Sequence, residues 1–267
     1  MTRLATAASA LGLATRLKIL LATILVCYTG YCVAETPVER LTSLGFVEIP
    51  IPVGEVLTKA NHSEDEICIE VTNDSFEIWD YPLECFSRTL SFEGATNTYI
   101  GTDRGEFGGG LEVIFPNGTS NSLLEDNVQA LFQIDESLYV FTGLAHLSLD
   151  DGAIYRIDAY DSRTPQVSRI TLLPSAPSVV ILRERSNGFR FFTIVSSSAI
   201  LTFDFTGESL SLVTGNQFWS ALYPSSAGAI DDTILIGARS GVILIEERFE
   251  VAKSVRFFTR DQALINN

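Results

Sequence analysis

The chain is poor in positive charge, and this shortage excludes a class of partners. Its 267 residues include 18 lysines and arginines against 33 aspartates and glutamates, which gives a formal net charge of −15. A surface of that sign repels nucleic acid and anionic lipid and favours a cationic partner. The alternative is that the acidity only keeps the protein soluble. We therefore expect no nucleic-acid partner.

Histidine is also scarce, which limits catalysis and metal binding. It occurs only as His62 and His146. No GxSxG or HExxH motif is present, so a Ser-His-Asp triad has at most two candidates for its base. His146 is the better candidate because Asp150 and Asp151 follow it closely, but Asp150-Asp151-Gly152 lacks the alternating ligands of a calcium loop. We expect no catalytic residue, no metal and no cofactor, although paired carboxylates for glycosidic cleavage stay open.

Four cysteines occur, and two of them fall in an N-terminal segment that we expect to be removed. The remaining pair, Cys68 and Cys85, lacks any CxxC partner, so no zinc site is indicated. Cys68 and Cys85 are 17 positions apart in the sequence. In an oxidising compartment, two cysteines at this separation can close a loop through a disulfide. We predict a disulfide between them, with two buried thiols as the alternative.

The first 34 residues have the pattern of a secretory signal. A basic stretch without acids precedes the apolar run Ile19 to Cys27, and small residues lead to Ala34. We predict a signal peptide over residues 1–34, cleaved after Ala34, and a periplasmic or secreted protein. The alternative is an uncleaved anchor, but nine strongly apolar residues are fewer than the roughly 20 that span a bilayer. Cleavage leaves 15 basic and 33 acidic residues, a charge of −18.

The chain is rich in paired apolar strands. One phrase, an apolar strand, a short turn and a second apolar strand, recurs at 67–80, 98–115, 138–158, 191–205 and 234–247. A period near 40 residues made only of strands is typical of propeller blades. Outside the signal segment no window has a convincing helical period. The sequence therefore predicts an all-β fold, a single small β-propeller of five blades over residues 35–267.

Further strands complete this prediction. Each repeat carries a third strand before the pair, for example within 127–143, 177–194 and 226–238. The turns that join it to the pair in these examples are polar: Asp135-Glu136, Ser186-Asn187-Gly188 and Asp231-Asp232. Phe46 to Leu57 is one strand-like stretch, interrupted by Pro50 and Pro52, which fits an edge strand. Propellers usually close by pairing strands from the two chain ends, and Ser254 to Thr259 is the candidate partner. Residues 211–225 hold at most a short helical turn.

Asn127 to Asp158, which reads NVQALFQIDESLYVFTG…GAIYRID, resembles the repeat of regulator-type and quinoprotein-like β-propellers. The resemblance extends to 98–115 and 234–247. The tryptophan docking motifs of the quinoprotein type are missing, since only Trp79 and Trp219 occur. The resemblance therefore implies a fold and carries over no cofactor.

The turns after the aligned strands provide candidate binding residues, because they should emerge on one face of the propeller. Those turns hold Asn73 and Asp74, then Asp103, Arg104 and Glu106, then His146, Asp150 and Asp151, then Ser196 to Ser198, and Arg239 with Ser240. Functional residues gather on displayed loops. We predict that this face carries the site, weighted toward the second and third loops as the longest and most acidic. In TDRGEFGGG we expect a hairpin loop with positive φ at Gly108, Gly109 and Gly110 rather than a phosphate cradle.

These features favour an exported acidic binding module that recognises a protein with a basic surface. An inhibitor or immunity protein is the specific version of that function. We expect a monomer without stable membrane insertion after signal cleavage. The alternatives are a propeller-fold hydrolase or lyase and a scaffold for assembly of the cell envelope.

Overall fold

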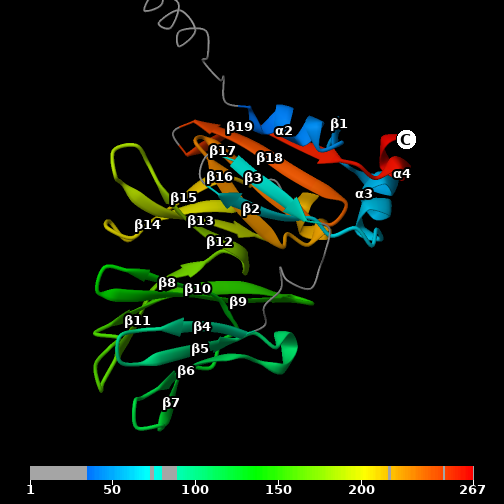
Figure 1. Ribbon diagram of the computed structural model, residues 1–267. Coiled ribbons are helices and arrows are strands. Elements are labelled where there is room, and N and C mark those ends of the chain that lie inside the picture. The colour runs from blue at the N-terminus through cyan, green and yellow to red at the C-terminus, as the bar shows by residue number, and fades with distance from the viewer. Residues whose placement is uncertain (1–34, 73–74, 80–88, 216–217, 249, 267) are drawn as a thin grey trace, which may run out of the picture. The chain divides into compact units, whose positions relative to one another are not determined.

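The computed structural model describes residues 35–72, 75–79, 89–215, 218–248 and 250–266 (Figure 1). The predicted signal peptide, Cys85, Asn73 and Asp74 lie outside these residues. The chain divides into two compact units, residues 1–40 and 41–267. Helix α2 (Pro37–Ser43), which crosses the boundary between the two units, begins with a capping box: Thr36 N donates to Glu39 Oε2 (2.8 Å), and Glu39 N donates to Thr36 Oγ1 (3.3 Å).

The described residues of the second unit form five antiparallel sheets. Sheet 1 has β2 (Cys68–Thr72) and β3 (Ser75–Trp79), and sheet 2 has β4 (Thr89–Glu93), β5 (Thr98–Thr102), β6 (Gly110–Ile114) and β7 (Ser120–Leu124). Sheet 3 has β8 (Val128–Ile134), β9 (Ser137–His146), β10 (Leu149–Asp158) and β11 (Gln166–Leu173). Sheet 4 has β12 (Pro177–Glu184), β13 (Arg190–Ser196), β14 (Ile200–Asp204) and β15 (Ser209–Thr214). Sheet 5 has β16 (Ser226–Ile230), β17 (Thr233–Ala238), β18 (Gly241–Arg248), β19 (Val251–Thr259) and β1 (Val47–Ile49).

This organisation confirms an all-β fold and is consistent with a propeller. Sheets 2 to 5 each run through four consecutive strands in chain order, as a propeller blade does. The first strands of the sheets contact one another in series: β4 lies against β8, β8 against β12, β12 against β16, and β16 against β2. The extra strand predicted before the pair in each repeat is present as β4, β8, β12 and β16, but the prediction is wrong for the first repeat, where helix α3 precedes β2.

The two chain ends share sheet 5, as predicted. Strand β1 pairs antiparallel with β19, with Val47 opposite Thr259 and Ile49 opposite Phe257. The predicted continuation of the first strand to Leu57 is wrong, because β1 ends at Ile49 and helix α3 (Gly54–Asn61) follows. Pro50 and Pro52 cannot donate to a ladder, and the short helix packs into an apolar cluster instead. A helix this short leaves too little periodicity to be recognised in the sequence.

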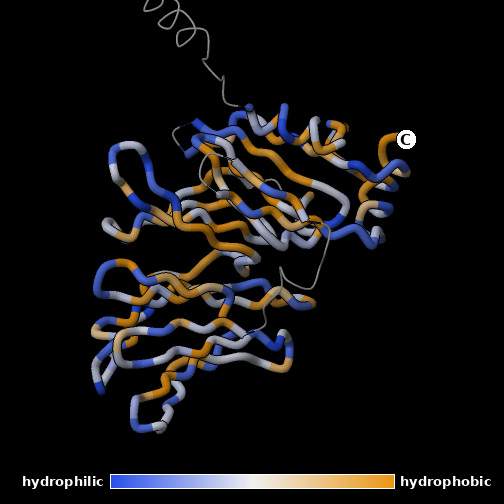
Figure 2. The backbone as a smooth tube through the Cα atoms, in the orientation of Figure 1, coloured by the Kyte–Doolittle hydropathy of each residue, from blue (hydrophilic) through white to orange (hydrophobic). Residues whose placement is uncertain are grey.

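The core lies between the sheets. One apolar cluster joins sheets 2 and 3, a second joins sheets 3 and 4, and a third joins sheets 4 and 5 with α3, η2 (Phe218–Leu222) and α4 (Gln262–Ile265). Phe192 is fully buried in the second cluster, with its ring centroid 4.9 Å from that of Phe141. Figure 2 shows hydrophobic residues running along the strands and hydrophilic residues at many turns. Nearly continuous apolar strands such as β17 and β18 fit strands that are covered on both faces.

Candidate functional site

The turns between the second and third strands of sheets 2 to 5 lie along one edge, which we call the η1 edge. It consists of residues 103–109, 147–148, 197–199 and 239–240. Polar contacts join neighbouring turns: Glu106 Oε2 lies 2.7 Å from His146 Nε2, and Ser197 Oγ donates to Asp150 Oδ2 at 2.6 Å. The turns between the first and second strands lie at the opposite ends of the same sheets, to the left in Figure 1.

The placement of His146, Asp150 and Asp151 in a long loop is wrong. They belong to β9 and β10, which extend as a hairpin to a two-residue turn, Leu147 and Ser148. Asp150 pairs in register with Ala145, and Asp151 with Leu144. The turn was missed because it contains no glycine, proline or asparagine, although Leu147 has the left-handed φ of +55° that such residues normally supply.

The glycine-rich segment forms a hairpin loop with a 3-10 turn, η1 (Gly105–Phe107). Positive φ occurs at Gly105 (+58°) and Gly108 (+80°), so the prediction of positive φ at Gly109 and Gly110 is wrong. Gly109 is needed for close approach instead, because a Cβ there would lie 2.3 Å from the Thr102 carbonyl oxygen. Gly110 begins β6, as expected for a hairpin rather than a phosphate cradle.

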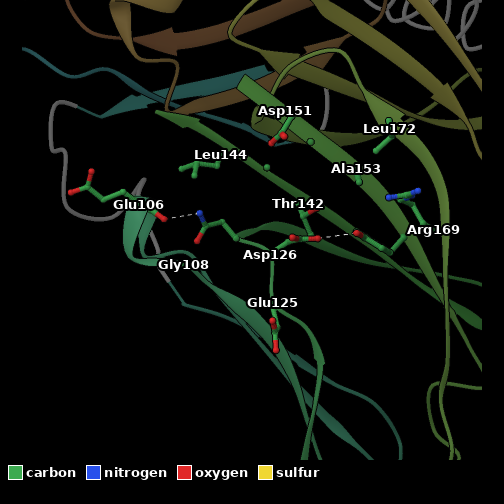
Figure 3. Close-up of a pocket in the computed structure, with 15 residues that line it drawn as sticks. Glu106, Gly108, Glu125, Asp126, Thr142, Leu144, Asp151, Ala153, Arg169 and Leu172 are labelled. Carbon is green, nitrogen blue, oxygen red and sulfur yellow. Dashed lines mark hydrogen bonds between the residues drawn. The ribbon is translucent and has the colours of Figure 1, made fainter. Parts of the chain in front are cut away.

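Between η1 and sheet 3 lies a cleft of about 340 Å³ (Figure 3). Among the described residues, four carboxylates line it, those of Glu106, Glu125, Asp126 and Asp151, together with a single arginine, Arg169. Leu144, Ala153 and Leu172 supply apolar surface. The excess of carboxylates makes the cleft a negative site that would attract cationic groups.

The carboxylates of the cleft differ in how they are engaged. Asp126 Oδ2 accepts a hydrogen bond from Tyr155 Oη at 2.8 Å. Burial raises the pKa of Tyr155 above its ordinary value, and Asp126 adds to that effect. Within the described part of the chain, the side chains of Glu125 and Asp151 have no hydrogen-bond or ion-pair partner. These two are therefore the carboxylates most available to a ligand.

Large apolar side chains are exposed beside this cleft. Leu147 is 95% exposed and Phe107 is 82% exposed, and each adjoins a member of the Glu106–His146 pair. Leu149 and Leu172 are also largely exposed. None of these four was predicted as a site residue from the sequence, because an exposed leucine or phenylalanine cannot be told from a core residue by its type. The only signal in the sequence was that Phe107 and Leu147 lie between two strands that were expected to pair.

Three of the predicted site residues are held by contacts within the fold. Asp103 accepts from Gly105 N (2.8 Å) and Gln129 Nε2 (3.0 Å), and Asp150 accepts from Ala176 N (2.8 Å) as well as from Ser197. Arg239 donates to the Asn61 carbonyl (2.8 Å) and to Glu66 (3.0 Å), and it lies over the Tyr223 ring. Arg104 lines a separate, smaller cleft of about 260 Å³. Of the predicted site residues, Glu106 and Asp151 line the acidic cleft, and His146 lies beside it through its contact with Glu106.

The structure also bears on the predicted disulfide, on metal binding and on membrane insertion. Cys68 is buried at the start of β2 and is disulfide-bonded, but Cys85 lies outside the described residues, so the pairing of these two stays a prediction. Among the described residues, no three histidine, cysteine or carboxylate side chains are grouped to hold a metal ion. The helices in this part of the chain are too short or too polar to cross a membrane.

A second cavity, of about 630 Å³, is lined by residues of the first strands β2, β8, β12 and β16. Its charged lining consists of Glu70, Arg183, Glu184 and Asp231. No histidine, cysteine or tyrosine is among its described lining residues. No described residue of the η1 edge lines this cavity, so it is separate from the acidic cleft.

Comparison with known proteins finds only distant structural similarity. No protein-family model and no curated protein matches the chain. Among solved structures, a nidogen/laminin complex matches with a TM-score of 0.40 and 10% identity, over 60% of this chain and 59% of that one. The extracellular domain of BT4673 from B. thetaiotaomicron matches with a TM-score of 0.42 and 11% identity, over 72% of this chain and 26% of that one. A luciferin-regenerating enzyme matches with a TM-score of 0.38 and 10% identity, over 68% and 65%.

At the level of fold, the predicted resemblance to β-propeller repeats agrees with the sheet organisation described above. The chain spans less than two thirds of each of these three structures, and each TM-score is below 0.5. Ligands and activities do not transfer at such distances.

Proposed function

We propose that the protein is an exported binding module, and that the η1 edge of sheets 2 and 3 recognises a protein partner with basic and apolar side chains. The observation that carries this proposal is the pair Phe107 and Leu147, exposed beside a cleft with four carboxylates. A contiguous apolar surface rimmed by polar groups is typical of an interaction site. The specific form of the proposal is an inhibitor or immunity protein for a basic secreted enzyme, on a propeller of five blades.

The conformation of Leu147 supports this proposal. A leucine with positive φ costs about 1–3 kcal/mol relative to an ordinary conformation. Because its side chain is 95% exposed, Leu147 gains almost nothing from the core in return. Burial against a partner would use the side chain that the turn displays. Strained residues held in this way are common at ligand-binding sites.

The charges support a basic partner. Glu125 and Asp151 have no partner in the described part of the chain, and the whole chain carries a net charge of −15. Charges at the rim of an interface mainly speed association, and salt screens that effect. The expected signature is fast association at low salt that slows as salt is added.

The test compares two charge-reversal variants of equal size. Glu106→Lys/Asp151→Lys changes the acidic cleft at the η1 edge, and Glu93→Lys/Glu136→Lys makes the same change in charge at the opposite edge. Asp150 is left intact because it holds Ala176 and Ser197. The immobilised protein is used to capture proteins from the exported fraction of the source organism, and association rates are measured for what it retains.

We expect a basic protein to be retained by the unmodified protein and by the opposite-edge control. The η1-edge variant should bind it more slowly, by about tenfold at low salt, with a smaller difference at high salt. Equal losses in the two variants would indicate a general effect of net charge. Unchanged kinetics in the η1-edge variant would place the site elsewhere. Either result rejects the proposal.

A further inference from the structure

A buried carboxylate lies at the opposite edge of sheets 4 and 5, away from the η1 edge. The Glu247 side chain on β18 is only 4% exposed, and its Oε1 lies 2.6 Å from Arg183 Nη1 on β12. Its second oxygen, Oε2, is buried and has no hydrogen-bond donor among the described residues. Such an oxygen is costly to leave unsatisfied, since a buried acceptor loses its hydration.

Arg183 gives no hydrogen bond to Oε2, because its described contacts run to other acceptors. Nη1 contacts Glu247 and also donates to Thr193 Oγ1 (3.3 Å), and Nη2 donates to the Asp231 carbonyl (2.9 Å). The guanidinium also lies over the Phe191 ring at 5.1 Å. These contacts hold Arg183 in place, and Glu247 Oε2 is left without a donor among the described residues.

Glu247 lines a cleft of about 640 Å³ between sheets 4 and 5. The charged groups that line it are Glu184, Asp231, Asp232, Glu247 and Glu250 on the acidic side and Arg183, Arg185 and Arg248 on the basic side. Arg185 forms an ion pair with Glu250 and lies over Phe189 and Phe191. Five carboxylates against three arginines leave the cleft net negative. It holds no group of three metal-ligating side chains among the described residues.

We propose that this cleft binds an organic cation with N–H donors, a protonated primary amine or a guanidinium, which donates to Glu247 Oε2. An anion would face the excess of carboxylates. A quaternary ammonium would have no N–H for Oε2. The site lies at the opposite edge from the proposed recognition surface, so the two proposals stand or fall independently.

The pH dependence of binding follows from the state of Glu247. Burial raises the pKa of Glu247 above its ordinary value, Arg183 opposes this, and Asp232 and Glu250 add to the rise. The ligand requires the carboxylate form. Affinity should therefore be full above the raised pKa and should fall as the pH decreases through it, at a higher pH than for an ordinary glutamate.

The test titrates the intact protein with n-butylammonium and, as a matched probe without N–H groups, with butyltrimethylammonium. We expect calorimetry to show saturable binding of the first and at least about tenfold weaker binding of the second. Glu247→Gln should weaken n-butylammonium binding by a similar factor. Asp232→Asn, which changes an exposed carboxylate at the rim, should weaken it only a few-fold.

Three results would overturn the proposal: no saturable binding of n-butylammonium, equal binding of the two probes, or unchanged binding by folded Glu247→Gln. If Glu247→Gln does not fold, the unmodified protein still decides the matter. Discrimination between the probes together with a loss of affinity in acid supports the site, and the lack of either rejects it.

Discussion

At the scale of single residues, polar side chains hold neighbouring sheets together at their turns. Asp161, which follows sheet 3's third strand, accepts hydrogen bonds from three backbone N–H groups before β5: Ala95 (3.0 Å), Thr96 (2.8 Å) and Asn97 (3.2 Å). Next to it, Tyr99 Oη donates to the Tyr160 carbonyl at 2.6 Å, and burial raises the pKa of Tyr99 to about 12.

Asp161→Asn tests this junction. Burial opposes ionisation of Asp161, but the backbone hydrogen bonds outweigh it, so the pKa of Asp161 lies below its ordinary value of 3.8. Its stabilising effect is therefore complete above that value and is lost as the pH falls through the lowered pKa. We expect the substitution to reduce the free energy of unfolding by roughly 1–2 kcal/mol at pH 7 and by less below pH of about 3. Urea unfolding at both pH values measures this, and an equal loss at both would contradict it.

Leu147→Asn tests the strained turn. Asparagine tolerates positive φ better than leucine, so we expect the free energy of unfolding to rise by about 0.5–1 kcal/mol. Capture of the basic partner should weaken in the same variant. Leu212→Asn is the control, since Leu212 is also exposed (58%) but lies within a strand with ordinary φ. A loss of stability in Leu147→Asn as large as in the control would show that the turn is not strained.

At the scale of elements, η1 is positioned by one glycine and one asparagine. Asn127 Oδ1 accepts from Arg104 N (3.2 Å), and Asn127 Nδ2 donates to the Gly105 carbonyl (2.9 Å). Gly109 allows this approach, because an added Cβ would lie 2.4 Å from Asn127 Oδ1 and 2.7 Å from Asn127 Cα. The acidic cleft therefore depends on the close contact between the η1 loop and the start of β8.

Gly109→Ala should move the loop. Because the clash involves backbone atoms, we expect a loss of about 1–3 kcal/mol in the free energy of unfolding and weaker partner binding. Gly215→Ala is the control, since its Cβ would meet nothing within 4 Å. Thermal unfolding of both variants measures the difference. A Gly109→Ala protein as stable as the control would rule out this close approach.

At the scale of the whole molecule, sheet 1 has only two described strands, and a disulfide would tie its start to the chain that follows. Cys68 is disulfide-bonded, and Cys85 is the predicted partner. We expect reduction to lower the free energy of unfolding by roughly 3 kcal/mol and native thiols to resist alkylation before it. Peptide mapping of the oxidised protein identifies the pair. Free labelling of both thiols under native conditions would refute the prediction.

The strands and their succession could be read from the sequence because their signals are local. Paired apolar runs separated by polar turns mark β9 with β10 and β17 with β18 wherever they pack. The pairing of β1 with β19 followed from the general rule that propellers close at their chain ends. The composition likewise determined the negative charge of the surface.

Only the tertiary structure decided which side chains are free to bind. Glu106, Asp150 and Asp151 look alike as sequence, but Asp150 is held by Ala176 and Ser197, residues far along the chain. The neighbouring sheet decides whether a carboxylate receives hydrogen bonds. Asp150 receives them, whereas Glu247 Oε2 has no donor among the described residues. Similarly, the exposure of Leu147 depends on where a hairpin ends. Local pattern determines strands, whereas the availability of a side chain depends on neighbours that only folding brings together.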